Sequence, residues 1–423
     1  MSARIFNINK GVQGYYIENN RFNTTLLTYN FYIPLNKEDM AINSLMPYIL
    51  TSCSEKYRDY IALNRQLLQL YGADLSCSVS KCGDCMHIKM GISVINNEFS
   101  LDDRKPVTDA NELLGELIFA PAISENGFYD DDVEREKLKT VERIEGEINN
   151  KRSFARTRLF EEMFASQPYG KFIYGRVEEV NAITGAQLLA AWKKLLETAF
   201  VRIILVGNCS PDEVFGSAEK YFSKINREKV TAASDIIVLP EAQEVNRVTD
   251  YMEITQGKLA MGFTSQLHGD IKTASALSLF ADIFGGGPYS KLFANVREKQ
   301  SLCYYCSAAA RRSKGFVMVE SGVEKENAQK TVDAVLKELK EMQKGNFDES
   351  VISAAKKSVS DALSAYNDHA SAIDGWYSRD LFSDVTPEEA IEILNAVTKE
   401  EIIKAAKGVK LHTVYMLLPK EDK

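Results

Sequence analysis

A short internal repeat constrains the fold of this chain more than any other feature of its sequence. Residues 181–184, NAIT, recur near the C-terminus as residues 395–398, NAVT. In each copy the threonine and a Gln or Glu three residues later form the pattern of a capping box, which starts a helix. A β-branched segment follows each helix. The shared order of cap, helix and strand predicts that the chain contains one structural unit twice.

The segments ahead of the repeat support the same duplication. Residues 24–36 and 257–268 each read as a strand, and an apolar-faced helix follows each of them. A second helix and strand come next in both halves, at 59–71 and 74–80 in the first and at 289–299 and 303–309 in the second. We therefore predict an α+β fold of two duplicated domains, each an antiparallel-rich sheet packed with helices.

Composition between the two halves indicates where they join. Residues 227–245 are small, polar and contain proline, as linkers do. The sequence thus predicts a first domain over residues 1–226, a linker over 227–245 and a second domain over 246–423. Each domain has about the size that single hydrophobic cores support.

Charge and histidine content exclude several classes of function. The 423 residues carry a formal net charge of −8, which disfavours binding to nucleic acid or to anionic membranes. The sequence has only four histidines, and no two are close enough to share a helical turn. A metal site built from paired helical histidines is therefore excluded. They are His87, His268, His369 and His412.

Cysteine usage and the apolar segments indicate the compartment. Seven cysteines are an odd number and do not read as a disulfide framework. The first twenty residues lack the apolar core of a secretory signal, and the longest apolar runs have only strand length. We therefore expect a reduced, cytoplasmic protein without membrane contact.

Residues 285–304 carry a likeness to a known family. The segments GGGPYSKLF, at 285–293, and VREKQSLCY, at 296–304, resemble a block of the pitrilysin/insulinase family of zinc peptidases. The likeness includes the mitochondrial-processing-peptidase-like bacterial members and covers nearly the whole chain. It implies duplicated α+β domains that face each other across a substrate chamber.

The zinc motif of that family is degenerate here. Active members carry His-x-x-Glu-His on the first long helix and a distal glutamate ligand on a later one. The resemblance places Ser44 and Tyr48 at the positions of the two histidines and Pro47 at that of the general base. It places Arg143 at the position of the distal ligand. Neither a hydroxyl-bearing serine nor a guanidinium replaces imidazole or carboxylate as a zinc ligand. We therefore expect no metal and no other cofactor in this chain.

A substrate-contacting pair from the family is retained. Arg297 and Tyr304 have the spacing of the family's Arg-x6-Tyr pair, which implies contacts to the substrate backbone and to the transition-state oxygen. The resemblance also places Gly285, Gly286 and Gly287 beside the substrate. The alternative, from spacing alone, is that Arg297 pairs with Glu298 on a solvated helix and that Tyr304 is a core aromatic.

These features imply a division of labour between two chains. The chain resembles zinc-less, YmfF-type members, and we expect a substrate-binding subunit of a heterodimeric metallopeptidase that acts on unfolded or short peptides. A zinc-bearing insulinase-family subunit would supply the metal in trans. The alternative is a non-catalytic scaffold or peptide-binding protein of the same fold, a type associated with maturation of elongation factor P.

Two further patterns leave alternatives open. Cys82 and Cys85, with Cys77 and His87 nearby, have the spacing of half a zinc site but also of buried residues around a hairpin tip. The acidic residues of the helix predicted at 128–148 alternate with basic ones. That mixture is typical of a solvated face with paired charges, and the alternative is an acidic wall that favours basic peptides.

Overall fold

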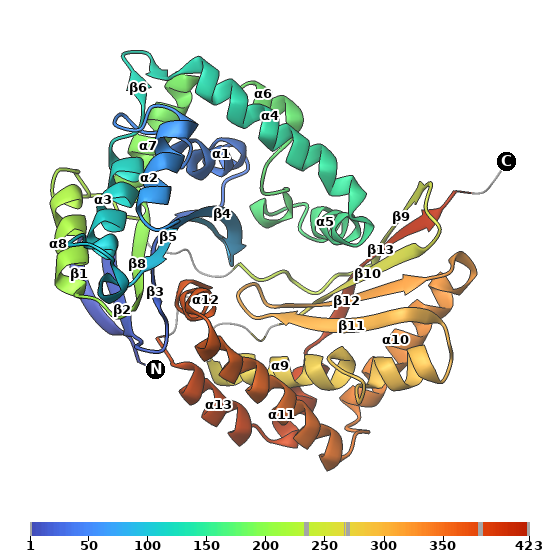
Figure 1. Cartoon of the computed structure of the whole chain (residues 1–423). Helices are drawn as coiled ribbons and strands as arrows, with labels where there is room; N and C mark the ends of the chain where they lie inside the picture. Colours follow the sequence, from blue (N-terminus) through green and yellow to red (C-terminus); the bar gives the residue numbers. More distant parts are fainter. Residues whose placement is uncertain (1, 232–236, 266, 268–270, 380–383, 421–423) are drawn as a thin grey trace. The chain divides into compact units, whose positions relative to one another are not determined.

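The computed structural model describes residues 2–231, 237–265, 267, 271–379 and 384–420. It is an α+β structure that divides into two compact units, each built around one main sheet (Figure 1). The units do not follow chain order, because each includes a segment from the other half of the sequence. Unit 1 comprises Met1–Glu145, Ile173–Asp235 and Ala365–Leu381, and unit 2 comprises Gly146–Phe172, Ile236–Ser364 and Phe382–Lys423.

Unit 1 contains a six-stranded sheet in the order β1-β2-β8-β3-β5-β4. β2 and β8 are parallel, and the other neighbours are antiparallel. The central strand β8 is almost wholly buried, as its apolar run FVRIILVG predicts. The strands are β1 (Arg4–Asn9), β2 (Val12–Glu18), β3 (Thr24–Pro34), β4 (Asp74–Cys82), β5 (Cys85–Ile95) and β8 (Phe200–Gly207).

Helices of unit 1 pack against this sheet, with α1 and α3 on β5 and α8 on β1. They are α1 (Met40–Leu50), α2 (Tyr60–Gln69), α3 (Pro106–Phe119), α4 (Asp130–Gly146), α6 (Val177–Asn181), α7 (Gly185–Thr198) and α8 (Pro211–Phe222). A two-stranded hairpin, β6 (Ile123–Ser124) and β7 (Gly127–Phe128), precedes α4. Short turns of 3₁₀-helix lie at Asn97–Phe99, Glu147–Asn149 and Pro168–Gly170.

Unit 2 contains a five-stranded sheet in the order β11-β12-β10-β13-β9. β9 and β13 are parallel, and the remaining pairs are antiparallel. Strand for strand this matches β4-β5-β3-β8-β2 of unit 1, which confirms the duplicated, antiparallel-rich α+β fold. The strands are β9 (Asn246–Met252), β10 (Gly257–Thr264), β11 (Cys303–Arg311), β12 (Phe316–Val323) and β13 (Lys410–Pro419).

Helices of unit 2 cover one face of its sheet, and Figure 1 shows α9 and α11 on that side. Their apolar side chains form the main core with β10, β12 and β13. The helices are α9 (Ile271–Gly285), α10 (Ala328–Gln343), α11 (Glu349–Ser364), α13 (Pro387–Ala396), α14 (Lys399–Lys407) and a π-helix, η4 (Leu292–Glu298). Short 3₁₀ turns lie at Lys325–Asn327 and Ala365–Asp368.

The exchanged segments each carry one helix. α5 (Lys151–Met163), from the first half of the sequence, packs on β10 and β13 of unit 2. α12 (Ala370–Arg379), from the second half, packs on β3 and β8 of unit 1. The domain boundaries predicted from the sequence stay a prediction, and the sequence did not predict this reciprocal exchange between the compact units.

The capping boxes of the repeat are confirmed. Thr184 and Thr398 each accept a hydrogen bond from the backbone N–H three residues later. In return, the threonine N–H donates to a side-chain oxygen of Gln187 or Glu401. The predicted strands at 24–36 and 257–268 correspond to β3 and β10. Part of the second prediction, and residues 232–236 of the predicted linker, lie outside the described residues. Within the described residues, no helix is long and apolar enough to cross a membrane.

Candidate functional site

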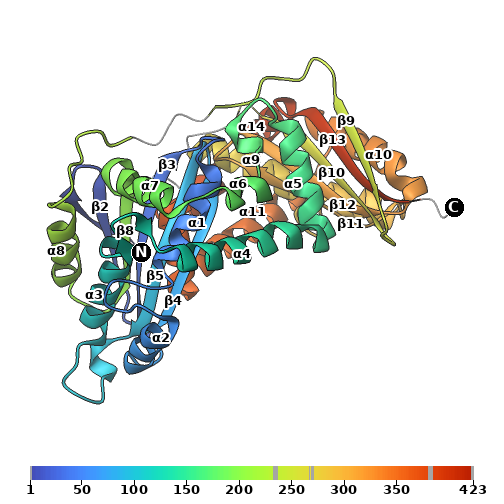
Figure 2. The same cartoon turned by 90° about the horizontal axis from the view of Figure 1, so that it is seen from above.

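The residues predicted at the degenerate zinc motif lie on α1 and α4 of unit 1, and Figures 1 and 2 show α4 passing close to α1. Ser44 is fully buried, and its hydroxyl donates to the carbonyl of Ala41 at 2.8 Å. Pro47 lies inside α1, where its carbonyl accepts hydrogen bonds from the N–H and the hydroxyl of Thr51. These two residues therefore serve the packing and the C-terminal end of α1.

Tyr48 and Arg143 are brought into direct contact. The guanidinium carbon of Arg143 lies 3.9 Å from the ring centroid of Tyr48, a cation–π arrangement. The Tyr48 hydroxyl lies 3.1 Å from that of Tyr174, which follows the first exchanged segment in sequence. The Nη1 atom of Arg143 is shielded from solvent and has no hydrogen-bond partner among the described residues. We call Tyr48, Arg143 and Tyr174 the arginine–tyrosine cluster.

The surroundings of this cluster keep the Tyr48 hydroxyl protonated. Burial and the hydrogen bond with Tyr174 raise the pKa of Tyr48 well above its usual value. Burial also raises the pKa of the nearby Cys77 thiol, although the charge of Arg143 and a hydrogen bond from Thr51 act in the opposite direction. At neutral pH the cluster therefore presents a fixed positive charge and a neutral phenol.

The donor set of this site does not fit zinc. A zinc site needs imidazole, thiolate or carboxylate ligands, whereas a guanidinium stacked on a phenol supplies a cation. Glu136, a buried acid of α4, forms ion pairs with Lys139 at 2.7 Å and Arg135 at 3.6 Å. Across the described parts of the chain, no group of three or more His, Cys, Asp or Glu residues could hold a metal ion.

The other charges of α4 are also largely paired. Arg135 bonds Asp132 at 2.9 Å, and Lys137 bonds Glu134 at 2.7 Å. Arg58, from the loop before α2, also bonds Asp132 at 2.7 Å. The charges are thus paired at spacings of three residues, as predicted, but the face is not simply solvated, because Asp132, Glu136 and Lys137 are buried.

Arg297 and Tyr304, the predicted substrate-contacting pair, lie in unit 2 on η4 and at the start of β11. Arg297 stacks on Phe293 and forms an ion pair with Glu298 at 3.6 Å, as the alternative reading expected. Tyr304 is 57% exposed, and its hydroxyl donates to a carboxylate oxygen of Glu324. The expectation of a core aromatic is therefore wrong, because the residue lies outside the packed interior.

A β-bulge explains the exposure of Tyr304. Cys303 pairs with Val323 and Tyr305 pairs with Gly322, so Tyr304 is the extra residue of β11. In a regular strand, residues two apart, such as Tyr304 and Cys306, point to the same face of the sheet. The bulge interrupts this alternation, so Tyr304 is exposed although Cys306 is buried. β11 is also an edge strand of its sheet. A ligand can therefore reach the Tyr304 side chain without displacing the core.

The glycines predicted beside the substrate terminate α9 against β11. A Cβ on Gly285 would lie 2.5 Å from the backbone nitrogen of Ala308, so only glycine permits this approach. The N–H of Gly286 donates to the carbonyl of Asp282 at 2.7 Å, within the last turn. Gly287 follows this turn directly. Their local role is close packing, and their contact with substrate stays a prediction.

The sequence reasoning missed a second Cys-x-x-Cys spacing, at Cys303 and Cys306. The bulge at Tyr304 brings the two thiols onto one side of β11, where they are hydrogen-bonded to each other. The hydrogen bond from Cys306 and the charge of Arg297 lower the pKa of Cys303 to about 7. The Cys-x-x-Cys spacing was visible in the sequence and could have indicated the pair. Only the structure shows the bulge that brings the two thiols together.

The first Cys-x-x-Cys pair lies at a hairpin tip, one of the two alternatives left open above. Cys82 and Cys85 are direct partners of β4 and β5, and Gly83 between them has a φ of +57°. Both cysteines are buried, and neither forms a disulfide. His87 is buried as well, bonds the side chain of Asn30 at 2.8 Å, and burial lowers its pKa to about 3.

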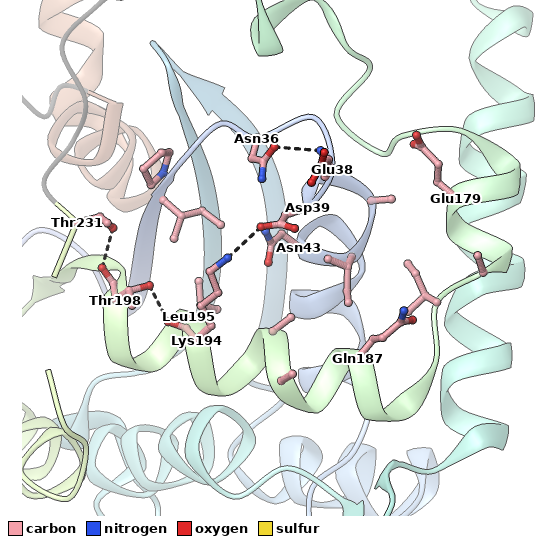
Figure 3. Close-up of a pocket in the computed structure, with 18 residues that line it drawn as sticks. Asn36, Glu38, Asp39, Asn43, Glu179, Gln187, Lys194, Leu195, Thr198 and Thr231 are labelled. Carbon is pink, nitrogen blue, oxygen red and sulfur yellow. Dashed lines mark hydrogen bonds and ion pairs between the residues drawn. The ribbon is translucent and has the colours of Figure 1, made fainter. Parts of the chain in front are cut away.

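A pocket of about 640 Å³ lies elsewhere in unit 1, between α7 and the chain from β3 into α1. Figure 3 shows Lys194 pointing toward Asp39, and their charged groups are 3.0 Å apart. The pocket is lined by none of the predicted site residues. The zinc-motif positions and this pocket are therefore separate features of the unit.

Comparison with known proteins supports the resemblance. Residues 182–359 match the family model described as the peptidase M16 inactive domain. Over 410 residues the chain is 28% identical to "Probable inactive metalloprotease YmfF" of Bacillus subtilis, with 96% of each chain covered. The chain is therefore similar to proteins of the M16, or pitrilysin, family of peptidases. It is also similar to an uncharacterized zinc protease of Rickettsia felis, 24% identical over 69% of this chain and 71% of its own length.

Solved structures of M16-like proteins share the fold. A conserved protein from Enterococcus faecalis superposes with a TM-score of 0.90 at 27% identity, over 100% of both chains. A peptidase M16 inactive domain from Pseudomonas fluorescens gives a TM-score of 0.78 at 19% identity, again over 100% of both chains. The M16 resemblance predicted from residues 285–304 and the α+β fold are thus confirmed.

Proposed function

We propose that this chain is the zinc-less, substrate-binding subunit of a heterodimeric metallopeptidase that acts on unfolded or short peptides. One observation carries the proposal: the guanidinium of Arg143 stacks on Tyr48 at the positions where the family motif would hold zinc. A chain built in this way needs another chain to supply a metal. A zinc-bearing M16 subunit is the partner that the family's chemistry favours.

The role of this chain would be to bind and position the peptide. A guanidinium and a phenol both donate hydrogen bonds to oxygen, and such donors stabilise the negative charge that develops on a carbonyl under attack. Arg297 and the exposed Tyr304 supply these two groups in unit 2. Glu324 holds the Tyr304 hydroxyl in the absence of a ligand. The backbone around Gly285–Gly287 would border the bound peptide.

The compartment belongs to the same proposal. None of the seven cysteines, all of which lie in the described residues, forms a disulfide, and Cys303 and Cys306 interact as thiols. Free thiols in close contact persist where the surroundings are reducing. We therefore place the complex in the cytoplasm.

Turnover by a reconstituted complex tests the proposal. The chain is combined with a zinc-bearing M16 partner, and hydrolysis of a quenched fluorescent peptide is measured for wild type, Arg297→Ala and Tyr304→Phe. We expect kcat to fall by roughly 10²-fold for each variant, the usual effect of removing one oxyanion donor. Tyr251→Phe is the matched control, because Tyr251 is also an exposed tyrosine of unit 2, at 56%. Equal turnover for Tyr304→Phe, Arg297→Ala and the control contradicts the proposal.

A second candidate is a non-catalytic scaffold or peptide-binding protein that acts in a route that matures elongation factor P. The Bacillus subtilis relative, named a probable inactive metalloprotease, favours this candidate. The two candidates differ in one result. A scaffold binds peptide but yields no turnover with any zinc-bearing M16 partner, whereas the proposed subunit yields turnover that depends on Arg297.

A further inference from the structure

The Nη1 atom of Arg143 is a donor without an acceptor. It is shielded from solvent and has no hydrogen-bond partner in the part of the chain that the structure describes. An unsatisfied donor on a charged group is costly, because the group has given up water without gaining a replacement. Such a group indicates either strain or a ligand that completes it.

The surrounding charges do not neutralise Arg143. On α4, Glu136 pairs with Lys139 and Arg135, and Glu134 pairs with Lys137. Glu142 and Glu145, which are nearer to Arg143 in sequence, are exposed and form no ion pair with it among the described residues. Among the described residues, Arg143 forms no ion pair that would use its guanidinium. The cation–π contact with Tyr48 stabilises its charge but accepts no N–H. One positive charge in this cluster is therefore left for an anion.

Tyr48 provides a second donor at the same place. Its hydroxyl lies 3.1 Å from that of Tyr174 and can accept a hydrogen bond from it. In that arrangement the hydroxyl hydrogen of Tyr48 remains available to a ligand. Tyr174 orients the Tyr48 hydroxyl, and the ring of Tyr48 stabilises the guanidinium charge while no ligand is bound. The phenol is thus held in place before a ligand arrives, and the guanidinium, whose Nη1 is shielded, turns to meet it.

We propose that Arg143 and Tyr48 bind a carboxylate group of a peptide, at the position where active relatives hold zinc. A carboxylate matches the guanidinium fork and carries the single negative charge that one arginine neutralises. A phosphate would bring more negative charge to a chain whose net charge is already −8. All three residues of the cluster are half-buried, so a ligand reaches the guanidinium by a rotation of its terminal torsions.

The proposal rests on the proposed function only in taking the ligand to be a peptide. The carboxylate itself has two sources, the peptide C-terminus and an acidic side chain. The structure favours neither, because both present the same two oxygens to Arg143. The experiment separates them.

Calorimetric titration of the intact chain tests the carboxylate site with three versions of one short peptide. One has a free C-terminus, one is amidated, and one is amidated with an internal glutamate. We expect a carboxylate-bearing version to bind about tenfold more tightly than the plain amide. Arg143→Gln removes that difference, and Tyr48→Phe reduces it. Arg135→Gln, which removes the same charge from the same helix, leaves the difference intact.

Each outcome bears on the carboxylate site or on the proposed function. Equal binding of acid and amide peptides by the wild type overturns the carboxylate site and leaves the proposed function standing. No binding of any peptide argues against the proposed function.

In that case, titration with acetate, followed by NMR of the arginine side chains, tests the carboxylate site by itself. A perturbed Arg143 signal supports the site, and an unperturbed signal overturns it. Arg143→Lys, which keeps the charge, provides a variant less liable to misfold.

Discussion

At the scale of single residues, the thiols of this chain differ because their surroundings differ. The charge of Arg297 and a hydrogen bond from Cys306 lower the pKa of Cys303 to about 7, whereas burial raises that of Cys209 to about 11. Thiolate is the reactive form. We predict that iodoacetamide labels Cys303 before Cys209, with a rate that rises through pH 7, as mass spectrometry of timed samples would show.

Two variants check the cause of this reactivity. Arg297→Gln removes the stabilising charge, and Cys306→Ser replaces the neighbouring thiol by a hydroxyl. The first should move the midpoint of the labelling profile to higher pH. Labelling of Cys209 as fast as Cys303 in the wild-type chain would contradict the explanation.

The buried histidine gives a pH dependence of stability. Burial lowers the pKa of His87 from 6.5 to about 3 in the folded state, so between these values the unfolded chain binds a proton that the folded chain does not. Stability from this group is therefore complete above pH 6.5 and falls as the pH drops below it. The slope approaches about 1.4 kcal/mol per pH unit.

Urea unfolding at a series of pH values measures this effect. The wild type should lose stability more steeply below pH 6.5 than His87→Gln, since glutamine does not titrate and can still reach Asn30. The difference between the two curves isolates His87 from the carboxylates that both proteins share. Parallel curves would mean that the histidine is protonated in the folded state.

At the scale of elements, the exchanged helix α12 is held by a buried carboxylate. Asp374 is wholly buried, forms an ion pair with Lys89 of β5 and accepts a hydrogen bond from Thr28 of β3. Removing one partner of a buried pair leaves the other uncompensated and costs about 3–5 kcal/mol. We predict a loss of this size in the free energy of unfolding for Asp374→Ala, measured by denaturant titration.

An exposed ion pair provides the comparison. Lys357 and Asp361 lie one helical turn apart on α11, at 3.3 Å, with side chains 78% and 67% exposed. Asp361→Ala should change stability by less than about 1 kcal/mol, as solvent-exposed pairs do. If both variants lose the same amount, burial does not explain the role of Asp374.

Among the elements, the sequence predicts the helices and strands but not the exchange of α5 and α12 between the two units. Capping boxes and strand patterns are local, so the repeat at Thr184 and Thr398 located its helices correctly. The exchange of α5 and α12 depends on which sheet face can accept a helix. Gly262 of β10 shows the reason: a Cβ there would lie 2.3 Å from the sulfur of Met163 on α5. No spacing in the sequence relates these two residues.

In the candidate site, too, the sequence locates some residues and only the structure shows the others. Tyr48 and Arg143 could be named because a family motif fixes their positions, although only the structure shows their contact. Tyr174 and Cys77 could not be named, since they lie far from that motif in sequence and join it by packing. The bulge that exposes Tyr304 likewise leaves no mark in the order of residues.

At the scale of the whole molecule, two units of one design carry different residues. Unit 1 has the positions of the zinc motif without zinc ligands, and unit 2 has Arg297 and Tyr304. In the proposed complex, this chain would contribute peptide-binding groups and a zinc-bearing M16 subunit would contribute the metal. That division is the central claim of the account, and metal content tests it directly.

The decisive measurement is the zinc content of the isolated chain and of the reconstituted complex after incubation with zinc and exhaustive dialysis, determined by plasma mass spectrometry. We predict no stoichiometric zinc in the isolated chain and one zinc in the complex, held by the partner. The prediction has a physical reason, because the Arg143 guanidinium on Tyr48 repels a metal cation. One tightly bound zinc in each isolated chain would contradict the account.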